Sequence, residues 1–116
     1  DGYVRGTVKS SRVEGRVVVE EGSAIVNSTV RGPAYIGSGS LVEDSYVGPY
    51  TSIGEGCRLL RAEVENSVLM DRVALEDVPW RIVDSIIGAE STIKGGGDSK
   101  PKGIRMFVGE RAVIGL

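Results

Sequence analysis

Branched aliphatic residues recur along the chain at steps of five or six residues. The steps repeat as five, six and six, so each aliphatic position returns after seventeen residues. The aliphatic positions are Val8, Val13, Val19, Ile25, Val30, Ile36, Val42, Val47, Ile53, Leu59 and Val64. A helix would place its apolar residues three and four apart, so a helix is excluded for this region. The period predicts instead an all-β parallel solenoid with three short strands in each turn.

The three strands of a turn define three sides of the predicted coil. The first side carries Val13, Val30, Val47 and Val64; the second carries Val19, Ile36 and Ile53; the third carries Val8, Ile25, Val42 and Leu59. Small residues are expected where the chain turns a corner. Ser11, Ser28 and Ser45 should stack as a hydroxyl ladder, interrupted at Ala62 and resumed at Ser85. A positive φ is predicted for Gly22, Gly39 and Gly56.

The rhythm breaks after Val64. We expect Ile82 to return to the third side, which would leave about six extra residues in an insertion at 73–81. The glycine- and lysine-rich stretch 94–103 is predicted to be a flexible loop, and the apolar stretch 104–116 a terminal cap over open strand edges. Residues 1–116 form a single domain in this interpretation. Since the chain begins at Asp1 within a turn of the coil, we interpret it as a piece of a longer protein.

Composition narrows the range of functions. The 116 residues are 41% hydrophobic and include 17 Gly, which is consistent with one folded domain. The net charge is −2 without runs of like charge, so neither nucleic acid nor a membrane is predicted as a partner. The single cysteine, Cys57, cannot form an internal disulfide, which is consistent with a cytoplasmic location. We interpret Cys57 as a small corner residue rather than a reactive thiol.

The chain contains no histidine. A hexapeptide acyltransferase typically uses a histidine base, and a zinc site on such a solenoid needs histidine ligands. The carboxylate pairs Glu20–Glu21, Glu43–Asp44 and Glu76–Asp77 are interpreted as solvated edges. We therefore predict no catalytic, cofactor-binding or metal-binding residue in this chain.

Several strings resemble one family. They are RGPAYIG, EDSYVGPYTSIG, EVENSVL, RIVDSIIG and MFVGERAVIGL, and together they are similar to the C-terminal left-handed β-helix of long-form glucose-1-phosphate thymidylyltransferases. The resemblance implies a left-handed coil attached to an N-terminal catalytic domain. In that family the enzyme uses Mg to join a sugar 1-phosphate to a nucleoside triphosphate, giving here dTDP-glucose. The family's GGxGxRLxPxT nucleotide loop does not occur in this chain. A hexapeptide acyltransferase and a purely structural oligomerisation module are the alternatives.

Outward positions of the predicted coil form two apolar columns. One holds Val18, Tyr35 and Leu69; the other holds Val26, Tyr46, Leu60, Val83 and Ile86. Such columns favour a buried face against another copy or the catalytic domain. Related solenoids often form trimers, so the resemblance implies a homo-oligomer, trimer ahead of dimer. The candidate interface residues are Tyr35, Tyr46, Leu60, Trp80, Val83 and Ile86. The sequence leaves open whether the Trp80 loop reaches a neighbour or packs on its own coil.

Overall fold

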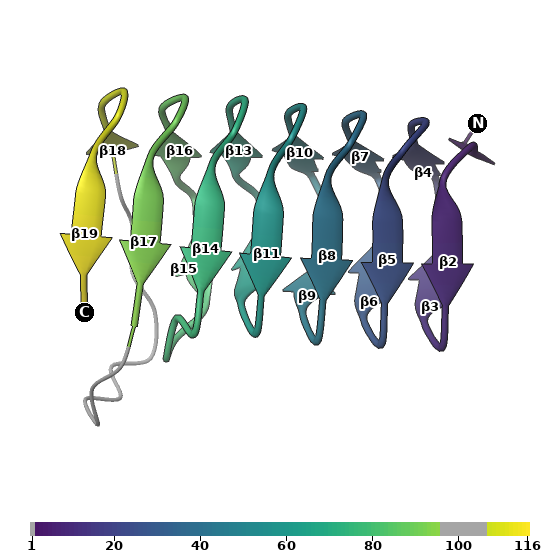
Figure 1. Ribbon diagram of the computed structural model, residues 1–116. Helices are drawn as coiled ribbons and strands as arrows, with labels where there is room; N and C mark the ends of the chain where they lie inside the picture. The colour runs from purple at the N-terminus through teal and green to yellow at the C-terminus, as the bar shows by residue number, and fades with distance from the viewer. Residues whose placement is uncertain (1, 96–106) are drawn as a thin grey trace.

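The computed structural model describes residues 2–95 and 107–116 and shows a solenoid of short strands, with the two termini at opposite ends (Figure 1). Each turn of the coil is here called a rung, and within the described residues it contributes strands to two or to all three of the sheets. Every strand pairing is parallel. The described residues contain no helix, and therefore none that could cross a membrane. The predicted all-β parallel solenoid is confirmed; its left-handed sense stays a prediction.

The first sheet has five strands and follows the first predicted side. Its strands are β3 (Arg12–Glu14), β6 (Thr29–Arg31), β9 (Tyr46–Val47), β12 (Glu63–Glu65) and β15 (Ile82–Val83).

The second sheet has seven strands. They are β1 (Tyr3–Val4), β4 (Val17–Val19), β7 (Ala34–Ile36), β10 (Thr51–Ile53), β13 (Val68–Leu69), β16 (Ile86–Ile87) and β18 (Phe107–Val108).

The third sheet also has seven strands. They are β2 (Thr7–Lys9), β5 (Ala24–Val26), β8 (Leu41–Glu43), β11 (Arg58–Leu60), β14 (Ala74–Glu76), β17 (Thr92–Lys94) and β19 (Val113–Gly115).

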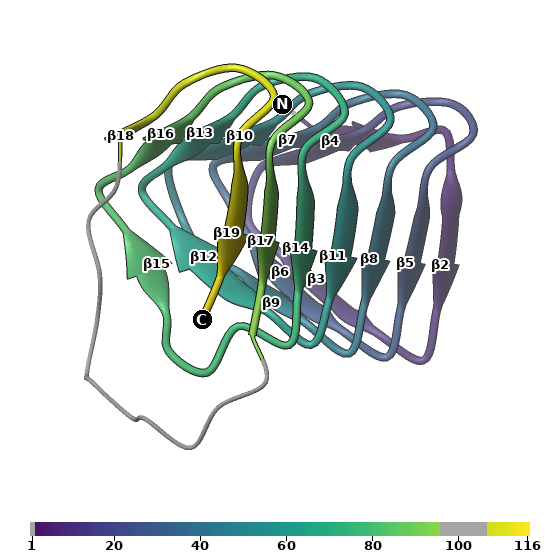
Figure 2. The same cartoon turned by 60° about the vertical axis from the view of Figure 1, so that its left-hand side comes forward.

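The three sheets surround the axis of the coil (Figure 2). The core is the column of inward side chains that they enclose. From Val19 to Val64 every aliphatic position named by the period is fully buried. Val8 is 37% exposed and Val13 only half-buried, because the first rung has no rung beneath it. The same column continues through Leu69, Leu75, Ile82, Ile87 and Ile93.

The corners are held by polar ladders. The backbone N–H groups of Ser28, Ser45 and Ala62 each donate to the serine hydroxyl one rung earlier, at 3.0, 3.0 and 3.1 Å. This confirms the ladder from Ser11 to Ala62. Its predicted continuation is wrong, because Ser85 lies at a different corner, where its N–H donates to the Ser67 hydroxyl at 3.0 Å.

Three glycines occupy one column of corners between the second and third sheets. Gly22, Gly39 and Gly56 have φ of 77°, 69° and 65°, as predicted. Further along the same column Arg72 adopts a φ of 57°. The left-handed conformation is therefore a property of the corner, which glycine adopts at lower steric cost than other residues.

The register after Val64 corrects the sequence interpretation. Ile82 pairs with Val64 in the first sheet, not with the third side, and Leu75 pairs with Leu59 in the third sheet. The predicted insertion at 73–81 therefore contains β14, a regular strand of the coil. The step from Leu75 to Ile82 is seven residues, against five in the earlier rungs, so the added length is two residues, not six.

The end of the chain continues the stack. Strands β18 and β19 pair with β16 and β17 and add a further rung in the region predicted as a terminal cap. Two residues of the predicted flexible loop belong to the described part of the chain. Lys94 ends β17, and the Gly95 N–H donates to the Glu76 carbonyl at 2.9 Å. Residues 96–103 lie outside the described residues, as does the start of the predicted cap.

Candidate functional site

A groove of about 1490 Å³ follows the corner where the third sheet leads into the first. Polar corner residues of successive rungs line it, and Val78–Arg81 lies along it. Arg81 donates to Glu63 and Glu65, at 3.0 and 2.9 Å, and its guanidinium lies 4.6 Å from the centre of the Tyr46 ring. The Asn27 amide donates to Asp44 at 2.6 Å. The charges of Arg81, Glu63 and Glu65 are thus satisfied by one another, and the Asp44 carboxylate is held by an amide.

The Trp80 loop packs against its own coil. Val78 is buried, Pro79 and Trp80 are half-buried, and all three line the groove. The Trp80 indole Nε1 is buried and has no hydrogen-bond partner within the described part of the chain. The geometry thus favours the packed arrangement of this loop over a projecting one.

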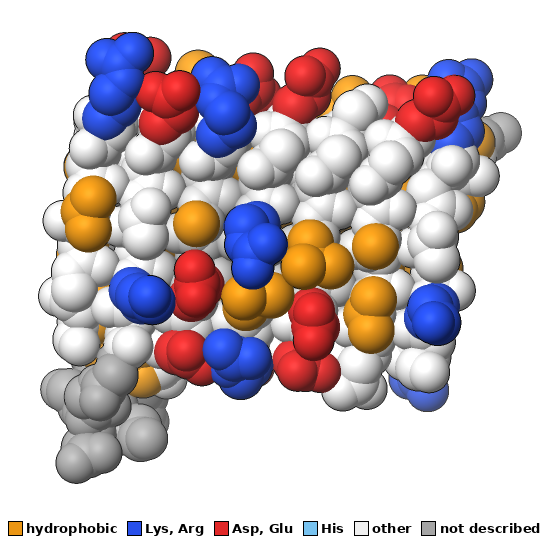
Figure 3. Space-filling view, in the orientation of Figure 1, with side chains coloured by type: hydrophobic (Ala, Val, Ile, Leu, Met, Phe, Trp, Pro, Cys, Tyr) orange, Lys and Arg blue, Asp and Glu red, His pale blue; other side chains and the backbone are white. Residues whose placement is uncertain are grey.

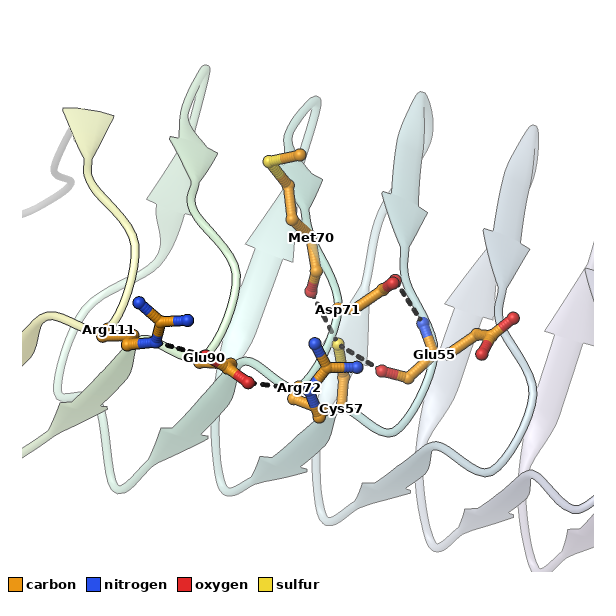
Figure 4. Close-up of polar contacts among 7 residues, drawn as sticks. All are labelled: Glu55, Cys57, Met70, Asp71, Arg72, Glu90 and Arg111. Carbon is orange, nitrogen blue, oxygen red and sulfur yellow. Dashed lines mark hydrogen bonds and ion pairs between the residues drawn. The ribbon is translucent and has the colours of Figure 1, made fainter.

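Cys57 occupies a corner of the second sheet's trailing edge (Figure 4). It replaces the serines of the ladder Ser23–Ser40, and its N–H donates to the Ser40 hydroxyl at 3.0 Å. Its Sγ lies 3.1 Å from the Met70 carbonyl oxygen. Burial raises the pKa of the Cys57 thiol, which disfavours the nucleophilic thiolate. The geometry is that of a packed corner residue.

A charged ladder joins the last rungs along the same column of corners (Figure 4). Glu90 accepts from Arg72 at 3.2 Å and from Arg111 at 2.8 Å. These two guanidinium groups lower the pKa of the Glu90 carboxyl group. The ladder ties three successive rungs together at the surface.

The acidic residues do not assemble into a metal centre. In the part of the chain that the structure describes, no group of three or more His, Cys, Asp or Glu side chains could hold a metal ion. The Mg that the family resemblance implies therefore has no fitting ligand set among these residues.

The outer faces of the three sheets differ in charge. On the third sheet, apolar side chains are interspersed with Lys, Arg, Asp and Glu (Figure 3). The first sheet carries the paired charges of Arg31 with Glu14 and of Arg81 with Glu63. The outward positions of the second sheet are all uncharged from β1 to β16: Tyr3, Val18, Tyr35, Ser52, Val68 and Ile86.

The candidate interface residues are distributed over all three sheets. Tyr35 and Ile86 lie in the second sheet, where both side chains are exposed. Tyr46 and Val83 lie in the first sheet and Leu60 in the third, all half-buried. Trp80 lies in the loop before β15. The predicted column through Val26, Tyr46, Leu60, Val83 and Ile86 is therefore not one column.

The structure also corrects the other predicted column. Leu69 is 1% exposed and belongs to the core, whereas its neighbour Val68 is 42% exposed and pairs with Ser52. Tyr3 and Tyr50 are exposed aromatic residues of this face that the columns predicted from the sequence did not include. The signal for Val68 was present in the sequence, because Leu69 follows Val64 after five residues instead of six.

The comparison with protein-family models found no match. Among curated proteins, the chain is 45% identical over 86 residues to a glucose-1-phosphate thymidylyltransferase of Streptomyces antibioticus, covering 73% of this chain and 24% of that protein. It is 47% identical over 74 residues to the Streptomyces griseus glucose-1-phosphate thymidylyltransferase, covering 64% and 21%. It is also 39% identical over 72 residues to the low-salt glycan biosynthesis nucleotidyltransferase Agl11 of Haloferax volcanii, covering 62% and 20%. The chain thus spans a quarter or less of each relative.

Among solved structures, the solenoid is similar to PerB of Caulobacter crescentus in complex with CoA and GDP-perosamine. The TM-score is 0.59 at 21% identity, covering 91% of this chain and 53% of PerB. A mutant of GDP-perosamine N-acetyltransferase from the same organism gives a TM-score of 0.51 at 18% identity, covering 99% of this chain and 53% of that protein. At these identities the likeness concerns the fold alone.

Proposed function

We propose that this chain is the assembly and regulatory solenoid of a sugar-1-phosphate nucleotidylyltransferase. The reason is that it is homologous to the C-terminal region of glucose-1-phosphate thymidylyltransferases. The observation that carries the proposal is the 45% identity over 86 residues to the Streptomyces antibioticus protein. The matched length is large enough to include several complete rungs of seventeen residues.

In the proposed reaction a phosphate oxygen of glucose 1-phosphate attacks the α-phosphorus of dTTP. The bond from that phosphorus to the bridging oxygen breaks, pyrophosphate leaves, and dTDP-glucose forms. An N-terminal catalytic domain with bound Mg would perform this step. The solenoid contributes assembly, as a homo-oligomer with trimer ahead of dimer, and contacts that catalytic domain. No nucleic acid or membrane partner is proposed.

The acyltransferase alternative has little in its favour. The chain has no histidine to act as the base, and the charged groups of its groove are engaged with one another. The similarity to acetyltransferase structures is a similarity of fold, and fold does not imply function.

The test is an assay of the complete gene product that contains this chain. Glucose 1-phosphate and Mg are supplied with each nucleoside triphosphate in turn, and pyrophosphate and nucleotide sugar are measured. We expect the complete protein to turn over fastest with dTTP. We expect no turnover by the 116-residue chain alone. The proposal fails if the complete protein forms no nucleotide sugar. It also fails if the chain alone transfers nucleotidyl or acetyl groups and a point variant within it abolishes that activity.

A further inference from the structure

We infer that the groove along the corner between the third and first sheets binds a neutral oligosaccharide, which lies along the solenoid across several rungs. The inference goes beyond the proposed function and does not depend on it, because it concerns a surface of this chain and no step of nucleotidyl transfer. It is argued from the polar column of the groove, its aromatic side chains, and the balance of its charges.

One side of the groove is a column of polar corner residues. Ser10, Asn27, Asp44 and Arg61 follow one another at intervals of seventeen residues, and all four adopt a φ between 47° and 52°. Their side chains are exposed and line the groove. Strands of neighbouring rungs lie about 4.8 Å apart, so the column extends over roughly 14 Å. A ligand on this column meets a hydrogen-bonding side chain at every rung, which suits a chain of repeating polar units.

An irregular corner adds an aromatic side chain to the groove. The corner between β14 and β15 has two residues more than its counterparts in earlier rungs, and Val78–Arg81 lies along the groove there (Figure 1). Trp80 of this corner and Tyr46 of β9 both line the groove and are half-buried. Aromatic rings commonly line ligand sites, and their negative faces attract the C–H groups of a sugar ring.

The Trp80 indole also carries an unused donor. Its Nε1 is buried and has no hydrogen-bond partner in the part of the chain that the structure describes. Buried N–H groups are rarely left without a partner in native structures. The residues between β14 and β15 belong to no strand, so this corner can shift without breaking a sheet. We expect a small shift on binding that lets the indole N–H donate to a ligand hydroxyl.

The charged side chains of the groove balance one another. Its lining includes three basic and three acidic residues: Arg12, Arg61, Arg81, Asp44, Glu63 and Glu65. Arg81 pairs with both glutamates. The other two arginines pair with acidic residues outside the lining, Arg61 with Asp77 and Arg12 with Glu14. Since each arginine already has a carboxylate partner, the groove favours a neutral ligand over a phosphate or a carboxylate.

A neutral ligand with many hydroxyl groups fits these properties. A hydroxyl group both donates and accepts, so it can bond to amide, carboxylate and guanidinium groups alike. Exposed ion pairs contribute little to stability, so these pairs can share their hydrogen bonds with a ligand at low cost. The groove volume of about 1490 Å³ exceeds the roughly 300–1,000 Å³ of typical small-molecule sites. This size favours an oligosaccharide over a single sugar.

The first test uses Trp80, the only tryptophan of the chain, as a reporter. Its fluorescence is followed while the chain is titrated with neutral cello-, malto-, manno- and galacto-oligosaccharides, and with oligogalacturonate as an acidic ligand of similar size. Calorimetry gives the dissociation constants. We expect a neutral oligosaccharide to bind, to change the Trp80 emission, and to bind more tightly than its own monosaccharide. Binding by no neutral member of the panel, or tighter binding of oligogalacturonate, would overturn the inference.

The second test locates the bound ligand with a matched pair of variants. Asn27 donates to Asp44 at 2.6 Å within the groove, and Asn66 donates to Asp84 at 2.7 Å at a corner outside it. We expect Asn27→Ala to weaken binding about 3- to 10-fold, as the loss of a hydrogen bond would, and Asn66→Ala to leave it unchanged. Urea unfolding shows whether both variants are folded.

Two results of the second test would place the ligand elsewhere and contradict the inference. One is an equal loss of affinity in Asn27→Ala and Asn66→Ala. The other is unchanged binding in both Asn27→Ala and Ser10→Ala. None of these measurements involves nucleotidyl transfer, so the inference and the proposed function fail independently of each other.

Discussion

Each inward aliphatic residue of the solenoid is enclosed by its own rung and by the rungs on both sides. Ile53 illustrates this, because it is fully buried and lies between Ile36 and Leu69 in the second sheet. Cores packed in this way respond to a change of even one methylene group. The stability of the coil therefore depends on single positions in the column.

Ile53→Ala should leave a cavity that neighbouring rungs cannot fill. We expect a loss of roughly 2–5 kcal/mol in the free energy of unfolding. Val68→Ala, on the adjacent rung but outward and 42% exposed, is the matched control and should cost much less. Urea unfolding of both variants measures the difference. Equal midpoints would show that the inward and outward assignments are wrong.

Individual residues also explain how far the sequence predicts this molecule. Up to Val64 the inward positions follow from the period, because each strand has one or two inward aliphatic residues at fixed spacing. The shorter corner after Val64 shows in the sequence as a step of five residues to Leu69, where the regular period of six would select position 70. The short strand β13 keeps Leu69 inward, and Val68 takes the outward place.

At the scale of the strand, register is maintained by the corners. Serine hydroxyls accept hydrogen bonds from the N–H groups of the following rung, and residues with positive φ lie where the chain turns from one sheet to the next. A corner can gain or lose a residue while the strands on either side still pair. This is why the two extra residues before Ile82 leave β14 and β15 in register with β11 and β12.

The ladder Arg72–Glu90–Arg111 makes a prediction about acid stability. The two guanidinium groups lower the pKa of Glu90, with Arg72 as the larger cause. A carboxyl group with a lowered folded-state pKa adds stability above its unfolded pKa, near 4.3, and loses it as the pH falls through the folded value. Glu90→Gln should therefore unfold at lower urea than wild type at pH 7.

The control for this prediction is the same pair of proteins at low pH. Below the folded-state pKa of Glu90 the two proteins should unfold at nearly the same urea concentration, because the wild-type carboxyl group is then neutral. A difference that persists undiminished at pH 2.5 would assign the effect to packing and not to the charge. High salt at pH 7 should reduce the difference, since the ladder is exposed.

At the scale of the whole molecule, the solenoid is an elongated body whose three faces differ in charge. The period predicted that outward apolar residues would gather into columns, but it could not assign them to faces, because an error of one residue at a corner moves a side chain between inside and outside. Only the paired strands show that the uncharged column belongs to the second sheet. The candidate site therefore depended on register more than on composition.

The central claim is that this solenoid is an assembly element. The most direct measurement is the mass of the purified 116-residue chain in solution, by light scattering over a range of micromolar concentrations. The account predicts a multiple of the 12.3 kDa chain mass. A wild-type mass of 12.3 kDa at every concentration would contradict it.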